Sequence, residues 1–258
     1  MTSNSGTVYS DSGNTGTGTS RLQDAIVVTG AGRRVGCHLA ERLLAQGWPV
    51  IAHHRSPTGE VERLRAAGAV CIAMDLSEPD AGLRLAAAIR ERADSLRAVI
   101  HNASAFDKTA PDSADALRQM DLFYAVHMRA PFALNLELAP LLQACTDRRA
   151  DILHITDIYA DNPNPAFDAY CATKAGLQNL ALSFAKRLAP KVKVNVVQPG
   201  PILFKEWHTD AARERVLSET LLGEEGGVEA IGMAVDAILR NHYQTGAVIP
   251  VDGGRRLA

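Results

Sequence analysis

Residues 25–36 read AIVVTGAGRRVG, a pattern that predicts a strand, a glycine-rich turn and the start of a helix. Its first four residues are apolar and include two valines, which is typical of a buried strand. Glycines follow at positions 30, 32 and 36, and a helical pattern begins at Val35. Glycine also ends strands for purely steric reasons, so the turn alone is weak evidence. The strand before it and the helix after it favour a loop whose backbone approaches a pyrophosphate at a helix N-terminus.

The alternation of strand and helix continues to the end of the chain. Short apolar runs rich in β-branched residues predict seven strands, at Ala25–Thr29, Pro49–His53, Ala69–Ala73, Ala98–His101, Asp151–Thr156, Val192–Val197 and Ala247–Ile249. Amphipathic stretches predict helices at Val35–Ala45, Glu60–Ala67, Leu83–Glu91, Asp115–Leu142, Tyr170–Leu188 and Val228–Arg240. Right-handed crossovers between parallel strands place helices on both faces. We therefore predict one Rossmann-like, doubly wound α/β domain over residues 21–258, with a seven-stranded parallel sheet.

Composition argues against several classes of protein. A hydrophobic fraction of 47% is enough for a buried sheet. The chain has 27 Lys and Arg against 29 Asp and Glu, without a cationic stripe, so we expect no nucleic-acid partner. No apolar run reaches the roughly 18 residues that a membrane span needs, so we expect no membrane partner. These features predict a soluble, cytoplasmic protein.

The cysteines and the first twenty residues carry no sign of a metal site or an exported protein. Cys37, Cys71, Cys145 and Cys171 have neither the close pairing of metal ligands nor the density of a disulfide framework. We expect free thiols in a reducing compartment and no metal. Residues 1–20, rich in Ser, Thr, Gly and Asn, lack the apolar core of a signal peptide and predict a flexible tail.

Residues 199–225 differ from the rest of the chain. The segment starts with Pro-Gly-Pro and carries Phe204 and Trp207 among polar residues. It follows the carboxyl end of a predicted strand, where open α/β sheets bind ligands. We predict a partly helical, mobile substrate lid, and the alternative is an ordinary surface connection.

The residues at the end of the second predicted strand indicate the coenzyme. An NAD site usually has an acidic residue about 20 positions after the glycines, and none stands there. The strand runs instead into His53-His54-Arg55-Ser56, where Arg55 can grip a 2′-phosphate, and Arg34 can reach the same region. This pattern favours NADPH, although these side chains could merely cap a strand. Asp75-Leu76 is placed for the adenine edge, with a helix cap as the alternative for Asp75.

Tyr170 and Lys174 stand four residues apart, hence on one face of a helix. A nearby positive charge is expected to lower the pKa of the tyrosine, so that the phenol acts as an acid near neutral pH. Such pairs are common on helix surfaces, and the position after the fifth strand is what makes this one informative. Thr156-Asp157 lies at the end of that strand, thirteen residues before Tyr170.

These motifs together resemble the short-chain dehydrogenase/reductase family. They are the glycine loop, His101-Asn102-Ala103-Ser104, Tyr-x-x-x-Lys, Pro199-Gly200 and Val251-Asp252-Gly253-Gly254, and the resemblance covers Ala25 to Arg256. The resemblance implies further coenzyme contacts besides the glycine loop and residues 53–56. It also implies a homotetramer that assembles through long helices. The predicted coenzyme contacts are Gly30, Gly32, Arg33, Arg34, Val35, Gly36, His54, Arg55, Ser56, Asp75, Leu76, Asn102, Ala103, Ser104, Tyr170, Lys174, Pro199, Gly200 and Ile202.

Three departures from the usual family pattern narrow the resemblance. Arg34 replaces the middle glycine of the loop, Asp157 the usual serine, and His127 the usual asparagine of the long helix. The first two resemble the pteridine reductase branch. Four stretches are similar to the bacterial dihydromonapterin reductases, a group that also acts on dihydrofolate: residues 31–36, 101–105, 188–195 and 252–255.

A carboxyl group suits the reduction of a dihydropterin. Hydride goes to the carbon of a C=N bond and a proton to the adjacent nitrogen, and Asp157 could donate that proton directly or through water if burial raises its pKa. The alternative is a carboxylate that caps the next segment. By resemblance, Tyr170 positions Asp157 and the ribose, and Lys174 binds the nicotinamide ribose hydroxyls.

The remaining substrate contacts are predicted around a flat slot beside the nicotinamide. Phe106 forms its other wall or is ordinary core packing. Ser104 supplies a hydrogen bond, and Arg34 reaches both pyrophosphate and pterin. His127 either bridges to a water chain, as a fourth catalytic residue, or is a satisfied buried histidine.

The leading hypothesis is NADPH-dependent reduction of 7,8-dihydromonapterin or a related dihydropterin, dihydrofolate included. A carbonyl or 3-ketoacyl reductase is the second, against which Asp157 argues. The third, a non-catalytic NADPH-binding sensor, is disfavoured by the intact Tyr170 and Lys174.

Overall fold

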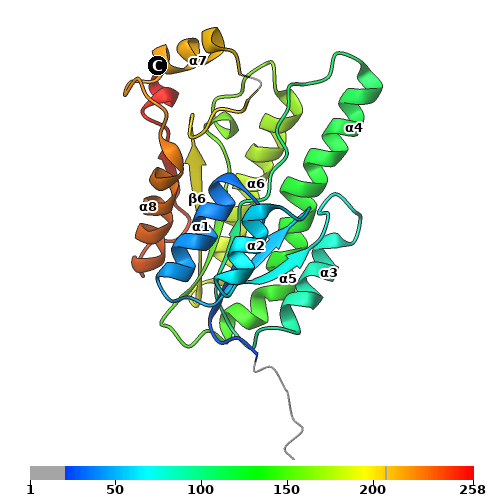
Figure 1. Cartoon of the computed structure of the whole chain (residues 1–258), viewed down its shortest axis with the longest axis vertical. Coiled ribbons are helices and arrows are strands. Elements are labelled where there is room, and N and C mark those ends of the chain that lie inside the picture. Colours follow the sequence, from blue (N-terminus) through cyan, green and yellow to red (C-terminus); the bar gives the residue numbers. More distant parts are fainter. Residues whose placement is uncertain (1–20, 207) are drawn as a thin grey trace, which may run out of the picture.

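One parallel sheet of seven strands forms the centre of the molecule (Figure 1). The computed structural model describes residues 21–206 and 208–258, so the predicted tail and Trp207 lie outside the described residues. The strands stand in the order β3-β2-β1-β4-β5-β6-β7. Their bounds are β1 Ala25–Val28, β2 Val50–His54, β3 Val70–Ala73, β4 Leu96–His101, β5 Ala150–Ile155, β6 Val192–Pro199 and β7 Val248–Val251. The predicted doubly wound sheet is confirmed.

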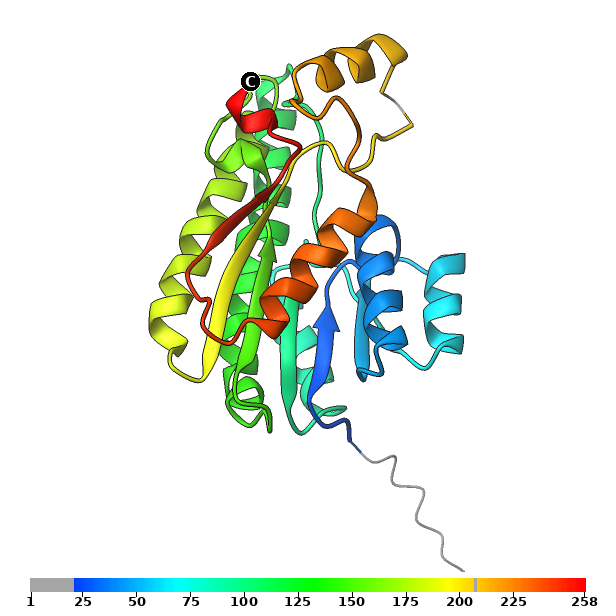
Figure 2. The ribbon, with the colours of Figure 1, turned by 90° about the vertical axis from the view of Figure 1, so that its left-hand side faces the viewer.

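Helices cover both faces of the sheet (Figure 2). One face carries α3 (Ala81–Arg90), α5 (Ala130–Gln143) and α6 (Asp168–Leu188), and the other carries α1 (Arg34–Ala45), α2 (Gly59–Ala66) and α8 (Gly227–Arg240).

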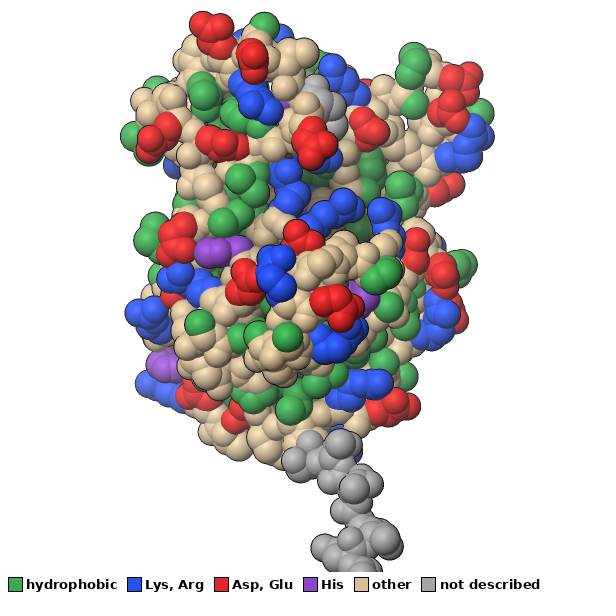
Figure 3. Space-filling model, viewed as in Figure 1, with side chains coloured by type: hydrophobic (Ala, Val, Ile, Leu, Met, Phe, Trp, Pro, Cys, Tyr) green, Lys and Arg blue, Asp and Glu red, His purple; other side chains and the backbone are tan. Residues whose placement is uncertain are grey.

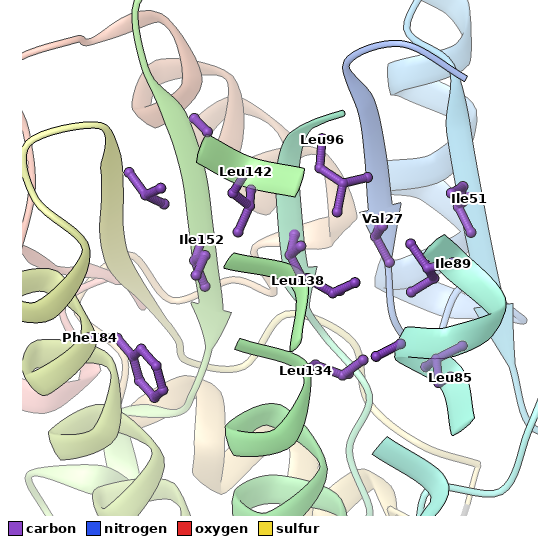
Figure 4. Packing of buried hydrophobic residues seen from close by; sticks show 14 of the residues in the cluster. Val27, Ile51, Leu85, Ile89, Leu96, Leu134, Leu138, Leu142, Ile152 and Phe184 are labelled. Atoms are coloured by element: carbon purple, nitrogen blue, oxygen red, sulfur yellow. The ribbon is translucent and has the colours of Figure 1, made fainter. Parts of the chain in front are cut away.

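Two hydrophobic cores result, because successive strand side chains point to opposite faces. Val27 of β1 packs under α3 and α5 with Leu85, Leu134 and Ile152 (Figure 4), whereas its neighbour Val28 packs under α1 and α8. Strands buried on both sides are typical of parallel sheets.

Each strand starts within one residue of its predicted start except β4. β4 begins at Leu96 rather than at Ala98. The charged Arg97 interrupts the apolar pattern, yet its side chain is only 2% exposed and is paired with the buried Asp151 on β5. A buried ion pair can thus hide a strand from a pattern of hydrophobicity.

The predicted helix Asp115–Leu142 is three consecutive segments. α4 (Ser113–Tyr124) continues into a π-helical turn, η1 (Ala125–Arg129), and then into α5. Pro131 follows this turn and has no N–H to donate to the carbonyl of residue 127, which is consistent with the wider turn. Single π-helical turns often lie at functional sites, and this one holds His127.

In the described part of residues 199–225, α7 spans Asp210–Ser218, so the predicted partial helicity is confirmed. Short 3₁₀ turns stand at Ile158–Ala160 (η2) and Arg255–Leu257 (η3). The four cysteines are free thiols. Within residues 21–206 and 208–258, no helix is long and apolar enough to cross a membrane, and no group of three His, Cys, Asp or Glu is placed to hold a metal ion.

Candidate active site

The predicted site residues meet at the carboxyl edge of the sheet, where the strand order reverses between β1 and β4. Asn102, after β4, donates from Nδ2 to the carbonyls of Thr29 (3.0 Å) and Gly30 (3.2 Å). Thr29 Oγ1 in turn accepts from the amides of Asn102 and Ala103, at 3.0 and 3.1 Å. Asn102 and Ala103 therefore brace the glycine loop from the neighbouring strand, at the crevice where such sheets bind ligands.

Two glycines of the loop are required by close packing. Gly30 has φ +68°, and a Cβ there would lie 2.7 Å from Cα of Ala103. A Cβ on Gly36 would lie 2.2 Å from the carbonyl oxygen of Gly30. Beyond Arg33, α1 begins at Arg34, so its free amides and positive dipole end stand at the loop, as anion binding requires.

Arg34 connects the glycine loop to the predicted lid. Its φ is +52°, the left-handed region that suits the glycine usual at this position. Its guanidinium donates to the carbonyls of Leu203 (2.6 Å) and Phe204 (3.4 Å). The side chain thus spans from the loop to residues 199–225, whereas we had predicted contacts with pyrophosphate and pterin.

We expect Arg34→Gly to be more stable than Arg34→Ala by about 1 kcal/mol, because only glycine relieves the cost of a positive φ. Both variants lose the bonds to Leu203 and Phe204, so the difference isolates the backbone. Urea unfolding midpoints measure it. An alanine variant as stable as the glycine variant would contradict the strained backbone.

The predicted coenzyme corner lies at the end of β2 and β3. Arg55 and Ser56 are exposed, while His54 is buried, with Nδ1 3.1 Å from the carbonyl of Ser56. Asp75 accepts from the amide and the hydroxyl of Ser77 at 2.9 and 2.8 Å, which lowers its pKa. Asp75 therefore caps a turn and not a helix, because α3 begins only at Ala81. Leu76 beside it is buried.

Asp157, Tyr170 and Lys174 form a connected group. Tyr170 Oη donates to Asp157 Oδ2 at 2.8 Å, and Asp157 Oδ1 accepts from the amide of Tyr159 at 2.9 Å. Lys174 Nζ donates to the carbonyl of Ile155 at 3.0 Å and lies 5.7 Å from the centre of the Tyr170 ring. Tyr170 and Lys174 are buried, whereas Asp157 is partly exposed. Asp157 caps η2, as the alternative predicted, and its second oxygen accepts from the Tyr170 phenol.

The electrostatics of this group correct one expectation. Burial raises the pKa of Asp157, against the hydrogen bonds from Tyr159 and Tyr170 and the charge of Lys174. Burial and the neighbouring Asp157 raise the pKa of Tyr170 well above its ordinary value. The predicted lowering by Lys174 is therefore wrong, because the carboxylate and not the ammonium contacts the phenol. Tyr170 stays protonated and donates to Asp157.

His127 connects the loop after β4 to α6. Its Nδ1 lies 2.9 Å from Thr173 Oγ1, and its Nε2 accepts the amide of Ala105 at 3.2 Å and lies 3.0 Å from Ser104 Oγ. Since Thr173 Oγ1 donates to the carbonyl of Tyr170 at 2.9 Å, Nδ1 carries the proton. Burial lowers the pKa of His127 well below its ordinary value, so the ring is neutral. These contacts favour the interpretation of His127 as a buried histidine whose two ring nitrogens both have hydrogen-bond partners. Ser104 also lies beside Tyr170.

Phe106 lies in an aromatic cluster at the mouth of the site. It stacks on Phe167 with ring centres 4.7 Å apart and meets the edge of Tyr170 at 4.8 Å. Lys205 Nζ, from the predicted lid, lies 4.7 Å from the Phe106 ring centre and donates to its carbonyl at 2.9 Å. Packing against Phe167 and Tyr170 thus holds Phe106 in this conformation, and the Lys205 ammonium lies over the Phe106 ring.

Val251 and Arg255, near the end of the chain, bind residues of the segment 199–225. Gly200 N, just after Pro199, donates to the carbonyl of Val251 at 2.9 Å, and Ile202 is buried. Arg255 donates to the carbonyl of Val216 on α7 at 2.6 Å and pairs with Glu219 at 2.6 Å. Lys and Arg side chains gather around a hollow on this face (Figure 3).

One cavity of the described residues is not lined by Asp157, Tyr170 or Lys174. Its volume is about 510 Å³, and it is lined by residues of the segments 201–202, 221–230 and 250–254. Ile202 and Gly254 belong to this lining, while Asp157, Tyr170 and Lys174 do not.

Two contacts of the glycine loop were missed by sequence reasoning. Thr58 Oγ1 donates to the carbonyl of Gly32 at 2.8 Å and also caps α2. A threonine before a helical pattern is a recognisable N-cap signal, so it could have been found. His53 accepts from the amide of Gly30 at 3.1 Å, a contact that no sequence pattern marks.

The fold and the Asp157–Tyr170–Lys174 group define an α/β oxidoreductase that binds a dinucleotide at the edge of its sheet. Residues 30–256 match the family described as Enoyl-(Acyl carrier protein) reductase. The chain belongs to the short-chain dehydrogenase/reductase family, as its motifs predicted, and within it stands with the dihydromonapterin reductases.

Three similar proteins illustrate this placement. The dihydromonapterin reductase of Klebsiella pneumoniae is 39% identical over 234 residues, which cover 90% of this chain and 96% of that protein. That of an Enterobacter species is 37% identical, with 91% and 98% covered. The structure of FolM alternative dihydrofolate reductase 1 from Brucella canis, complexed with NADP, is 29% identical with a TM-score of 0.81, covering 92% of this chain and 95% of that one.

Proposed function

We propose that this protein reduces a 7,8-dihydropterin, such as 7,8-dihydromonapterin, with NADPH. One hydride and one proton are added across a C=N bond, which yields the tetrahydropterin and NADP⁺. The observation that carries the proposal is the hydrogen bond of 2.8 Å between Tyr170 and Asp157, which holds a carboxyl group where a carbonyl reductase of this family has serine. Relatives named dihydromonapterin reductase and an NADP-bound structural neighbour support it.

The chain offers a matching site for NADPH. The free amides at the start of α1 suit a pyrophosphate, and exposed Arg55 and Ser56 at the end of β2 suit a 2′-phosphate. No acidic side chain stands at residues 53–56 to repel that phosphate. The bound coenzyme supplies the hydride. Lys174 and Tyr170 would bind the nicotinamide ribose, and Pro199, Gly200 and Ile202 would border the nicotinamide ring.

Asp157 holds the proton that the reaction needs. A raised pKa keeps a larger share of this carboxyl protonated near neutral pH than a surface aspartate would have. Since Tyr170 remains protonated, it orients the carboxyl through Oη and leaves proton transfer to Asp157, directly or through one water molecule. Ser104, next to the phenol, is placed to bind the pterin edge.

The pterin would lie between the nicotinamide and the cluster around Phe106. In the described conformation, Lys205 lies against Phe106 and Arg34 holds Leu203 and Phe204. We infer that residues 199–225 act as a lid, which moves these side chains when substrate enters and then excludes water.

Activity should fall above pH 8. Burial lowers the pKa of Lys174 from 10.5 to about 8, although Asp157 opposes this. Above that pH the ammonium loses the charge that holds the ribose, so kcat/KM should show an alkaline limb near 8, in addition to the decline that deprotonation of Asp157 causes at lower pH. Lys174→Arg, which stays charged, should move the limb to higher pH. An unmoved limb would remove Lys174 from this role.

Stability should not fall over the same range. Between about 8 and 10.5 the unfolded chain binds the Lys174 proton more tightly than the folded chain does. This group therefore raises the free energy of unfolding as pH increases through that window. Loss of activity at pH 9 without a lower urea midpoint separates titration from unfolding.

One assay separates the candidate functions. Purified protein is given NADPH with 7,8-dihydromonapterin, 7,8-dihydrobiopterin, dihydrofolate or a panel of ketones, and coenzyme oxidation is followed. We expect turnover with dihydropterins. The kcat/KM values of the dihydropterins then rank them as substrates. Turnover with ketones alone would identify a carbonyl reductase, and NADPH binding without turnover would identify a sensor.

We further propose a homotetramer that acts in the cytoplasm. Exposed apolar side chains gather on the outer faces of α4 and α5, as helix-mediated association requires, and they are Leu117, Met120, Leu122, Tyr124 and Phe132. Four free thiols suit a reducing compartment. Light scattering of the purified protein tests the tetramer.

A further inference from the structure

His53 lies at the end of β2 between two loops of the coenzyme site. Its side chain is only 2% exposed. Nδ1 accepts the amide of Gly30 at 3.1 Å, and Nε2 lies 3.0 Å from the carbonyl oxygen of Met74. Because a carbonyl only accepts, Nε2 carries the proton and Nδ1 offers its lone pair to Gly30. The two partners fix one neutral tautomer.

The main chain of His53 strengthens the same connection. Its carbonyl accepts the amide of Ala31 at 2.8 Å, so two successive amides of the glycine loop bind this one residue. On the other side, Met74 immediately precedes Asp75, and its amide donates to the carbonyl of His54 at 2.9 Å. One imidazole thus connects the glycine loop after β1 to the loop at Met74–Asp75 after β3.

Burial suits the ring to this task. It lowers the pKa of His53 to about 4, so Nδ1 is an acceptor throughout the neutral range. A buried amide that loses its acceptor is costly, so the direction of the Gly30 amide is strongly held. Neither partner belongs to the catalytic group, so the contact acts on coenzyme binding and not on proton transfer.

We propose that His53 is a positioning residue for the coenzyme, which holds the glycine loop and the loop at Met74–Asp75 in the relative placement that one dinucleotide requires. This inference rests on the proposed use of NADPH. It assigns His53 a role separate from that of the exposed Arg55 and Ser56, which are proposed above to bind the 2′-phosphate.

Two near-isosteric variants separate the two contacts. The amide of asparagine stands where Nδ1 stands, so His53→Asn keeps an acceptor for Gly30. The amide of glutamine stands where Nε2 stands, so His53→Gln keeps a donor for Met74 and loses the acceptor. We expect His53→Gln to raise the Kd of NADPH roughly tenfold, measured by coenzyme fluorescence, and His53→Asn to remain close to wild type. For both, kcat at saturating NADPH should be unchanged.

Several results would overturn the inference. Equal NADPH affinity in His53→Gln and wild type would overturn it. So would an equal loss of NADPH affinity in both variants, if that loss parallels the fall in the melting temperature of the coenzyme-free protein. If the variants fold poorly, nitrogen NMR of the histidines in wild-type protein decides, since a proton on Nδ1 of His53 is incompatible with the proposed bond. Wild-type protein that binds no NADPH would overturn the proposed function itself.

Discussion

Asp157→Ser should lower kcat/KM for dihydropterin reduction by about 10²–10⁴-fold, the usual contribution of a positioned proton donor. The serine hydroxyl can replace Oδ1 as the acceptor of the Tyr159 amide, so η2 keeps its cap. What disappears is the carboxyl proton beside the substrate nitrogen. Since Asp157 is not expected to contact the phosphates, the Kd of NADPH should be unchanged. Stopped-flow reduction and fluorescence titration measure the two quantities.

Asp168→Ser provides a matched control. Asp168 is an exposed acid in the first turn of α6, two residues before Tyr170, and serine is equally acceptable there. This variant should keep wild-type activity. Unchanged dihydropterin reduction in Asp157→Ser would remove the carboxyl from the mechanism, whereas parallel loss of NADPH affinity would indicate damage to the coenzyme site.

Asp151→Ala should destabilise the fold by about 3–5 kcal/mol, because it leaves buried cations without their partner. Asp151 is fully buried on β5, next to Arg97 of β4 and to Lys193 of β6, whose Nζ is 2.9 Å away. The two cations also bind carbonyl oxygens at the end of α8, Leu239 at 2.7 Å and Ile238 at 2.8 Å. Loss of the carboxylate therefore affects three strands and one helix at once.

The control for this substitution is Asp147→Ala. Asp147 also binds Arg97, at 3.0 Å, but its side chain is 39% exposed, so its loss should cost under about 1 kcal/mol. Urea unfolding with an unchanged slope compares the variants. A cost for Asp151→Ala no larger than that of Asp147→Ala would show that the buried group contributes little.

Much of the architecture could be predicted, because parallel strands buried on both faces leave short apolar runs that the sequence shows directly. The predicted β4 was too short because Arg97 is a charged residue in the sequence, whereas in the structure it is buried and paired with Asp151. The π-helical turn at His127 was not predicted, since periodicity reports an average over the helix and not one wider turn.

The proximity of Asp157, Tyr170 and Lys174 could be predicted from the sequence, but their hydrogen-bond partners could not. Tyr170 and Lys174 share a helix face, which spacing reveals, yet the ammonium binds Ile155 and the phenol binds Asp157. Those pairings depend on how β5 packs against α6, which spacing does not show. The predicted direction of the Tyr170 pKa shift was therefore wrong. The link between His53 and Gly30 joins neighbouring strands, and no local pattern records it.

We propose that hydride passes from NADPH to a ring carbon of a dihydropterin. Reaction of 7,8-dihydromonapterin with NADPH deuterated at its transferable position, followed by mass spectrometry and NMR of the product, tests this transfer. We expect a tetrahydropterin with one deuterium on the carbon of the former C=N bond. Unlabelled pterin, together with deuterium in the alcohol formed from an added ketone, would contradict it.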